Sequence, residues 1–222
     1  MHRSILVHIP RTGGMSVRTY MESRYTSFNL VFENRDTVLT IPKDVEFIST
    51  NHAAMRKVFA RGLMNKRVWD NSFKFCFVRN PWDRLVSVYK YYCGFRRKKN
   101  YKSNCLLETF DIFVSRVIGN GEYLTGLKVR NSQPHFNHAL PQTSWIEEGV
   151  NYIGRFERLG EDWKEVCDLM CIKYEPLPVV NRSQHFHYSR YYTAESKRVV
   201  SKFYEQEIEL FKYRFEDSRN GK

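Results

Sequence analysis

Two polar motifs carry the side chains that could do chemistry in this chain. The first follows an apolar run at residues 4–9 and has the sequence Pro10-Arg11-Thr12-Gly13-Gly14-Met15-Ser16. Its backbone N–H groups, its guanidinium and its two hydroxyls suit an anion. The spacing is not that of a Walker A loop, which has the pattern G-x-x-x-x-G-K-S/T. A plain strand-to-helix turn with a surface arginine would contain the same residues, so the motif alone leaves both interpretations open.

The second motif follows the apolar run at residues 73–78 and has the pattern R-x-P-x-x-R-x-x-S, from Arg79 to Ser87. It places an arginine at the end of a predicted strand and a hydroxyl further along the next helix. Such junctions bind phosphate because free N–H groups and the positive end of the helix dipole face the anion. Two of them on one sheet predict a ligand with anionic groups at both ends. The alternative is that Arg84 and Ser87 merely face solvent.

His52 is the candidate general base. It stands just beyond a predicted strand at residues 44–49, so it would emerge on the same sheet edge as both motifs. An imidazole titrates near neutral pH, which suits proton transfer from a hydroxyl. The alternative is a histidine that caps the following helix or packs beneath its start.

The other histidines are weaker candidates. His8 lies within a predicted buried strand and is expected to be a core residue. His135 and His138 lie in a polar segment, where they could touch an acceptor or simply face solvent. His185 and His187 form an H-x-H pair without an obvious third ligand, so no metal site is predicted.

The elements that position these residues alternate between strand and helix. Strands are predicted at residues 4–9, 44–49, 73–78 and 150–156, and helices at 15–23, 52–61, 81–93, 107–118, 160–170 and 194–211. Asn80 and Thr193 are predicted to cap helices. This alternation predicts an α/β fold with a mostly parallel central sheet and helices on both faces. No linker is evident, so the chain is predicted to form a single domain over residues 1–222.

Composition limits the partners. The chain of 222 residues has a formal net charge of +12, which predicts an acidic partner, and 15% aromatic residues argue against disorder. Its five cysteines are an odd number without zinc-finger spacing, so all are expected to be reduced. Neither a signal peptide nor an apolar stretch long enough for a transmembrane segment is evident. We therefore expect a cytoplasmic protein, or a soluble catalytic domain excised from a membrane-anchored protein.

Together the motifs resemble those of the sulfotransferases that use 3′-phosphoadenosine 5′-phosphosulfate (PAPS). That family has P-K/R-T-G-G-x-S after the first strand and R-x-P-x-x-R-x-x-S after a later one. The segments HIPRTGGMS, FVRNPWDRLVSVY, IGRFERL and YYTAESKRVVSKFYEQEIELFKYRF are most similar to the carbohydrate branch, near the uronyl 2-O-sulfotransferases. The similarity spans residues 4–215 and implies a P-loop nucleotide-kinase-like sulfotransferase fold.

The resemblance also implies roles for the motif residues. The first loop would hold the 5′-phosphosulfate, through Arg11, Thr12, Gly13, Gly14, Met15 and Ser16. Arg79 and Ser87 would hold the 3′-phosphate, and His52 would be the base for transfer to a carbohydrate hydroxyl, leaving the bisphosphate PAP and needing no metal. The family usually has lysine where Arg11 stands. An arginine there can stabilise charge but does not give up a proton at ordinary pH.

Several further residues could contact the nucleotide or the acceptor. They are Arg155 at the end of the fourth predicted strand, and Arg182 and Ser183 in a basic and aromatic loop. The basic run at residues 96–102 could attract an anionic polysaccharide or be a solvated loop.

Two other functions fit parts of the pattern. One is a divergent P-loop kinase that uses ATP, which magnesium dependence would distinguish. The other is a non-catalytic basic module that binds glycan or nucleic acid, although no RNA-binding signature is recognisable. The sulfotransferase interpretation predicts no nucleic-acid partner. The sequence leaves open the identity of the acceptor, which could also be a lipid-linked sugar, a small glycoside or a tyrosine, and the oligomeric state.

Overall fold

The computed structural model describes residues 3–24, 28–30, 47–50, 59, 62, 64–98, 109–119, 138–146, 149–180 and 186–217. The chain divides into two compact units, one formed by residues 1–79 and 142–182, the other by residues 80–141 and 183–222. The single domain expected over the whole chain stays a prediction.

The first unit is built on a five-stranded sheet with the strand order β2-β3-β1-β4-β5. The strands are β1 (Ser4–Leu6), β2 (Phe28–Leu30), β3 (Phe47–Ser49), β4 (Phe73–Val78) and β5 (Tyr152–Arg155), and every neighbouring pair is parallel. The parallel α/β fold is therefore confirmed. The bounds of β4 match the prediction, β1 is shorter than predicted, and the edge strand β2 was not predicted.

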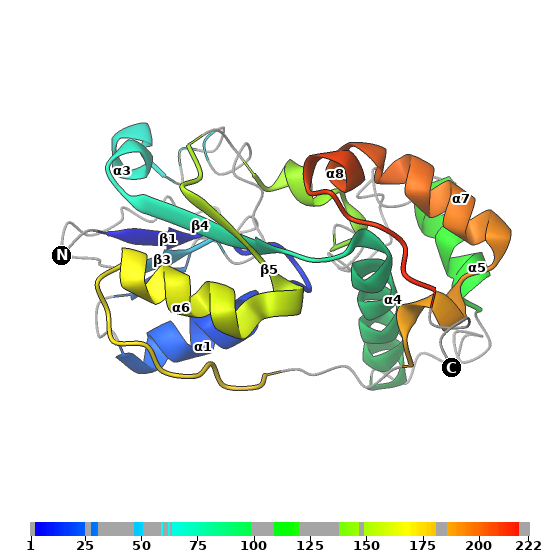
Figure 1. Cartoon of the computed structure of the whole chain (residues 1–222), viewed down its shortest axis with the longest axis horizontal. Coiled ribbons are helices and arrows are strands. Elements are labelled where there is room, and N and C mark those ends of the chain that lie inside the picture. Colours follow the sequence, from blue (N-terminus) through cyan, green and yellow to red (C-terminus); the bar gives the residue numbers. More distant parts are fainter. Residues whose placement is uncertain are drawn as a thin grey trace. The chain divides into compact units, whose positions relative to one another are not determined.

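Two helices cover one face of this sheet, α1 (Gly14–Arg24) and α6 (Leu159–Leu169) (Figure 1). Their apolar side chains pack on the strands because alternate strand residues point to the same face. The shared core consists of Leu6, Val17, Tyr20, Met21, Phe47, Phe75, Phe77, Trp163, Val166 and Cys167. Each of these side chains is buried, so the core fixes the carboxyl ends of β1 and β4.

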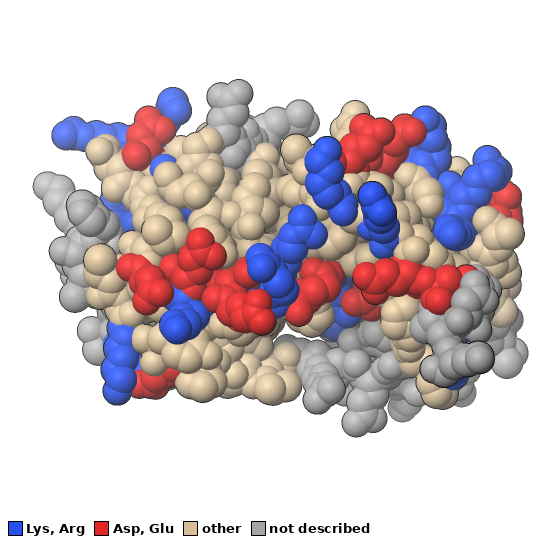
Figure 2. Space-filling view, in the orientation of Figure 1, with Lys and Arg blue, Asp and Glu red and all other residues tan. Residues whose placement is uncertain are grey.

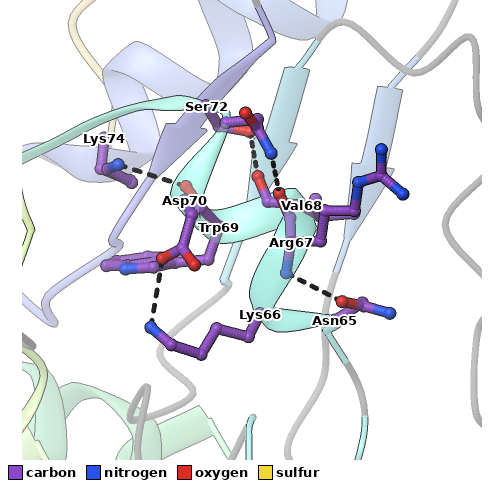
Figure 3. Close-up of polar contacts among 9 residues, drawn as sticks. Asn65, Lys66, Arg67, Val68, Trp69, Asp70, Ser72 and Lys74 are labelled. Atoms are coloured by element: carbon purple, nitrogen blue, oxygen red, sulfur yellow. Dashed lines mark hydrogen bonds and ion pairs between the residues drawn. The ribbon is translucent and has the colours of Figure 1, made fainter.

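A short helix that the sequence did not predict, α3 (Lys66–Asp70), precedes β4. The side chain of Asn65 caps it by accepting a hydrogen bond of 2.8 Å from the Arg67 N–H (Figure 3). The buried Lys74 donates from Nζ to the Trp69 carbonyl at 3.2 Å, and its ammonium lies 5.5 Å from the Trp69 ring centroid. The cap and the lysine together fix the amino end of β4.

The second unit is helical in its described residues. Its elements are α4 (Pro81–Lys98), α5 (Phe110–Val114), the π-turn η2 (Ser115–Gly119), the 3-10 turn η6 (Tyr188–Tyr191), α7 (Ala194–Phe203) and α8 (Glu205–Leu210). The predicted helix at 194–211 is two helices that meet at Tyr204. Helix α4 continues past the predicted end to Lys98, because arginine and lysine are good helix formers.

Two of these helices begin at the side-chain caps that the sequence predicted. The Asn80 side chain accepts from the Trp82 N–H at 3.1 Å, ahead of Pro81 at the first helical position. Thr193 and Ser196 form a capping box at the start of α7, with 3.2 Å between the Ser196 N–H nitrogen and Thr193 Oγ1. These local signals explain why both helix starts are readable from sequence.

Aromatic rings form the core of the second unit. The ring centroids of Phe110 and Tyr192 are 4.8 Å apart, and Phe215 packs edge-on against both Tyr192 and Trp82. The Tyr192 hydroxyl donates to the Trp82 carbonyl at 3.0 Å, and its burial raises its pKa well above the usual value. Helix α4 and the C-terminal segment are thereby held to the same core.

Some expectations fall outside the described residues, among them the helix at 52–61 and most of the basic run at 96–102. The described cysteines, Cys76, Cys93, Cys167 and Cys171, are free thiols, as expected. In the described part of the chain, no helix has both the length and the apolar character to cross a membrane.

Candidate functional site

The first loop depends on two glycines. Gly13 has a φ of 87°, and a Cβ there would come within 2.7 Å of the Leu159 side chain. At Gly14 a Cβ would overlap the ring of His8. His8 is buried, as the sequence predicts, and packs directly beneath the loop. The glycines therefore let the loop approach both His8, which follows β1, and Leu159 at the start of α6.

Some polar groups of this loop form hydrogen bonds within the turn, whereas others have no acceptor inside the helix. Thr12 is buried and its hydroxyl donates to the Ile9 carbonyl at 2.9 Å, so that proton serves the turn. The Gly13 carbonyl accepts from the Ser16 N–H at 2.9 Å. The N–H groups of Gly14 and Met15 belong to the first turn of α1, which offers them no intrahelical acceptor. The loop therefore presents backbone donors more than hydroxyls.

Arg11 has an unusual backbone. Its φ is 67°, in the left-handed backbone region, which a residue with a Cβ adopts at a cost of order 1–3 kcal/mol. The conformation turns the Arg11 carbonyl toward β4, where the Arg79 Nη1 donates to it at 3.1 Å. A strained arginine thus sits at the point where the two predicted anion-binding loops meet.

Arg79 is held on three sides. Its guanidinium donates to Arg11, and its Cζ lies 4.1 Å from the centroid of the Phe156 ring. Its backbone N–H and carbonyl pair with the side chain of Gln142, which is fully buried in the turn η4 (Gln142–Ser144). Arg79 itself is only 6% exposed. The plane and position of its guanidinium are therefore strongly restrained.

The turn between β5 and α6 forms a third wall of this site. Phe156 begins the 3-10 turn η5 (Phe156–Arg158); its ring lies beneath the Arg79 guanidinium and is close enough to Gly13 that a Cβ there would come within 3.2 Å of it. Asp162 is buried, accepts from the Arg155 N–H at 2.5 Å and pairs with Arg158 at 3.0 Å. Arg155 lies at the end of β5, as predicted. Asp162 thus fixes the turn that carries Phe156 and Arg155.

The second unit contains the rest of the second motif. Arg84 is fully buried, where its guanidinium donates to the carbonyls of His138, at 2.8 Å, and of Leu140. Ser87 is also fully buried. The alternative that Arg84 and Ser87 merely face solvent is therefore wrong. His138 is buried as well, with its ring 5.6 Å from that of Tyr91, so it packs inside this unit.

Several predicted site residues lie outside the described part of the chain: His52, His135, Arg182, Ser183 and His185. Val180 is the last described residue before Arg182, and its N–H donates to Ser16 Oγ at 3.4 Å. His187 is described, and its Nδ1 accepts from the Ser189 N–H at the start of η6. The predicted roles of the five residues stay predictions.

Charge is distributed unevenly around the first unit. Acidic side chains gather over α6 in Figure 2, where Glu161, Glu165 and Asp168 are exposed. The loops described above contribute arginines instead. Within the described segments, no three His, Cys, Asp or Glu side chains come together as a possible metal site. The arrangement can therefore hold an anion between two loops through guanidinium and N–H groups.

Two residues of this site were missed by sequence reasoning. Phe156 stands in the segment IGRFERL, but its contact with Arg79 joins residues far apart in the chain. Gln142 ends the polar segment at 131–142, where it resembles an ordinary loop residue, and it lies 63 positions from Arg79. The one sequence signal at this position is an amide side chain next to a proline, and that signal is too weak to predict that the side chain is buried.

Solved structures offer distant likenesses. The sulfotransferase from Alicyclobacillus acidocaldarius has a TM-score of 0.43 and 13% sequence identity, over 96% of this chain and 99% of that chain. The mouse sulfotransferase SULT7A1, solved in complex with PAP, has a TM-score of 0.44 and 16% identity, over 99% of this chain and 68% of that chain.

Sequence comparison is more informative. An uncharacterized protein of Archaeoglobus fulgidus is 28% identical over 112 residues, which are 48% of this chain and 73% of that protein. Residues 2–214 match the family described as the sulfotransferase family. The match includes the glycine loop at residues 10–16 and the arginine motif at residues 79–87, and it covers residues of both compact units. The chain therefore belongs to the sulfotransferase family.

Proposed function

We propose that this protein transfers a sulfuryl group from PAPS to a hydroxyl of a carbohydrate acceptor. The observation that carries the proposal is the hydrogen bond of 3.1 Å from Arg79 Nη1 to the Arg11 carbonyl. It joins two loops that each suit an anion, at the carboxyl edge of a parallel sheet, where α/β proteins bind their ligands. PAPS has anionic groups at both its 5′ and 3′ positions, so it fits a pair of joined sites.

The first loop would bind the 5′-phosphosulfate. The N–H groups of residues 12–15 and the positive end of α1 favour negative charge there. The Arg11 side chain would stabilise the charge that grows on the phosphate oxygen when the sulfur–oxygen bond breaks. Because a guanidinium keeps its proton at ordinary pH, Arg11 would act through charge and hydrogen bonding alone.

The 3′-phosphate would lie at Arg79. A guanidinium held in one plane is suited to a phosphate because it can donate two parallel hydrogen bonds. Ser87, Arg155, Arg182 and Ser183 are proposed as further contacts of the nucleotide. Loss of the Arg79 side chain should therefore weaken binding of a nucleotide that has a 3′-phosphate more than one that lacks it.

His52 would be the general base. The acceptor oxygen forms a new bond to sulfur as the sulfur–oxygen bond to the phosphate breaks, and the hydroxyl proton passes to the imidazole. The support is its position in the sequence, after β3, whose carboxyl end lies beside that of β1. The balance of the reaction then leaves PAP, a sulfated acceptor and one proton, and needs no metal.

The charge of the chain bears on the acceptor. With a formal net charge of +12, the protein attracts polyanions at low salt. The exposed acids of α6 would repel one, so an anionic polysaccharide should approach over another surface. The proposed carbohydrate acceptor can therefore itself carry negative charge.

Calorimetry can test the donor. The protein is titrated with PAP, with adenosine 5′-monophosphate, and with ATP in the presence and absence of magnesium. We expect PAP to bind without metal and at least tenfold more tightly than the monophosphate, because a charge-assisted contact contributes about 1.5–3 kcal/mol. Tight binding of ATP that requires magnesium, with no preference for the 3′-phosphate, would indicate a kinase instead.

A second experiment tests the acceptor. The protein is incubated with radiolabelled PAPS and a panel of neutral and uronate-containing glycans, and transfer of label is measured. We expect label on a glycan hydroxyl. Transfer to a tyrosine peptide in place of every glycan would keep the sulfotransferase assignment and refute the carbohydrate acceptor.

A further inference from the structure

Gln142 completes the hydrogen bonding of Arg79 at the point where the sheet ladder has ended. The last paired residues of β4 and β5 are Val78 and Arg155, so Arg79 lies one residue beyond the ladder. Its N–H donates to Gln142 Oε1 at 2.8 Å, and its carbonyl accepts from Gln142 Nε2 at 2.9 Å. A side-chain amide has the same donor and acceptor as a peptide unit, so Gln142 takes the place of a neighbouring strand.

The pairing is fully buried and therefore geometrically demanding. Gln142 has no exposed surface, and Arg79 is 6% exposed. A buried donor or acceptor that loses its partner destabilises the fold, so neither residue can shift alone without penalty. The backbone of Arg79 is consequently locked relative to η4.

The guanidinium end of the same residue is also restrained, by the Arg11 carbonyl and the Phe156 ring. A small displacement of the Arg79 backbone would lift the guanidinium from the ring or break its bond to the first loop. The pairing with Gln142 therefore sets the distance between the two arginine-bearing loops.

We propose that Gln142 is a positioning residue that fixes Arg79 for recognition of the 3′-phosphate of the nucleotide. The inference rests on the proposed function, because it assumes that Arg79 binds that phosphate. Gln142 acts through the backbone of Arg79, and its loss should reduce the advantage of a nucleotide with a 3′-phosphate over one without it.

The test uses the ratio of two dissociation constants, adenosine 5′-monophosphate over PAP, measured by calorimetry on the full chain. Gln142→Met keeps the length of the side chain and removes both hydrogen bonds. We expect the ratio to fall roughly tenfold, the effect of misplacing one charge-assisted contact. Binding of the monophosphate should change much less, because the first loop keeps its own donors.

The chain offers a matched control at the other end of the same strand. Asn151, which is exposed, also pairs with the backbone of a β4 residue: its Oδ1 accepts from the Lys74 N–H at 2.8 Å, and its backbone N–H donates to the Lys74 carbonyl at 2.8 Å, so substitution of the side chain removes the first of these bonds. Asn151→Leu should lower the melting temperature, as Gln142→Met should, but it should leave the ratio unchanged. A merely structural role for Gln142 would give the two variants equal ratios.

The outcomes separate the two proposals. A wild-type protein without preference for PAP overturns the proposed function and this inference with it. A wild-type preference that Gln142→Met retains in full overturns only the role of Gln142. Should Gln142→Met fail to fold, Gln142→Asn serves in its place. It keeps the amide but is one methylene shorter, so it cannot make both hydrogen bonds to the Arg79 backbone at their present distances, and a fall in the ratio is again expected.

Discussion

At the scale of single residues, Arg11 combines two properties that can be separated by substitution. Its side chain provides the charge proposed to stabilise the leaving phosphate, and its backbone is left-handed, with a φ of 67°. A residue with a Cβ is strained in that conformation, and glycine is not. The family lysine would be equally strained, so the strain belongs to the loop and not to the choice of arginine.

Arg11→Gly should therefore be more stable than Arg11→Ala. Glycine relieves about 1–2 kcal/mol of left-handed strain and gives back about 0.4–1 kcal/mol through the entropy of the unfolded chain. We expect a net gain of up to about 1.6 kcal/mol in the free energy of unfolding, measured in guanidinium chloride. Both variants should lose turnover, whereas Arg11→Lys should retain much of it. A glycine variant that is less stable than the alanine variant would contradict the strain argument.

The proposed base makes a sharper prediction. His52→Ala should lower kcat by about 10²–10⁴, the range for loss of a general base, with little change in the dissociation constant for PAP. The acid limb of the pH–rate profile should also disappear, because the neutral imidazole is the active form and protonation below its pKa removes it.

A second histidine provides the control for that experiment. His187→Ala removes an imidazole whose Nδ1 accepts from the Ser189 N–H, so it should leave the acid limb in place. If His52→Ala keeps a near-normal kcat and the same acid limb, the proton goes elsewhere, and His135 is the next histidine to test.

At the scale of elements, several local signals predicted the structure correctly, whereas contacts between distant residues were not predicted. β4 and both helix caps follow from neighbouring residues, and the structure places them as predicted. The edge strand β2 has only three residues, too few for a recognisable alternation. Gln142 and Phe156 owe their roles to partners far along the chain, and no local pattern encodes such a partner.

A buried thiol in strand β4 should make the stability of the protein depend on pH. Cys76 is fully buried in it, and burial raises the pKa of its thiol to about 12. The folded state keeps this proton while the unfolded chain loses it above about pH 8.5. Stability should therefore be complete below that pH and fall as the pH rises toward 12, by up to about 1.4 kcal/mol per pH unit.

Because other buried groups titrate in the same range, the test compares the loss of stability in the wild type with the loss in a variant that lacks this thiol. The free energy of unfolding is determined at pH 8 and at pH 10.5 for the wild type and for Cys76→Ala. We expect the wild type to lose about 2.5 kcal/mol more than the variant over this interval. In native protein at pH 8, iodoacetamide should modify the exposed Cys171 and spare Cys76. Equal losses in the two proteins would show that the Cys76 thiol does not titrate with folding.

At the scale of the whole molecule, neither compact unit is a continuous stretch of chain. The chain passes from one to the other between residues 79 and 80, 141 and 142, and 182 and 183. In each unit, two segments that are distant in the chain pack together, and the segment of chain between them belongs to the other unit. Unfolding of one unit therefore turns that intervening segment into a flexible loop that the other unit must close. The family match at residues 2–214 likewise covers both. These connections favour one cooperative domain.

A core substitution in one unit should consequently be felt in the other. Val200 in α7 is fully buried in the second unit, and Val200→Ala should cost about 2 kcal/mol through lost packing. If the chain is one domain, the slowest-exchanging amides of β4, in the first unit, should exchange about thirtyfold faster, since 1.4 kcal/mol is a factor of ten. Val179→Ala, at a position 79% exposed, is the matched control and should change little. Faster exchange confined to α7 and its neighbours, with β4 unaffected, would show that the units unfold independently and would overturn the single-domain prediction.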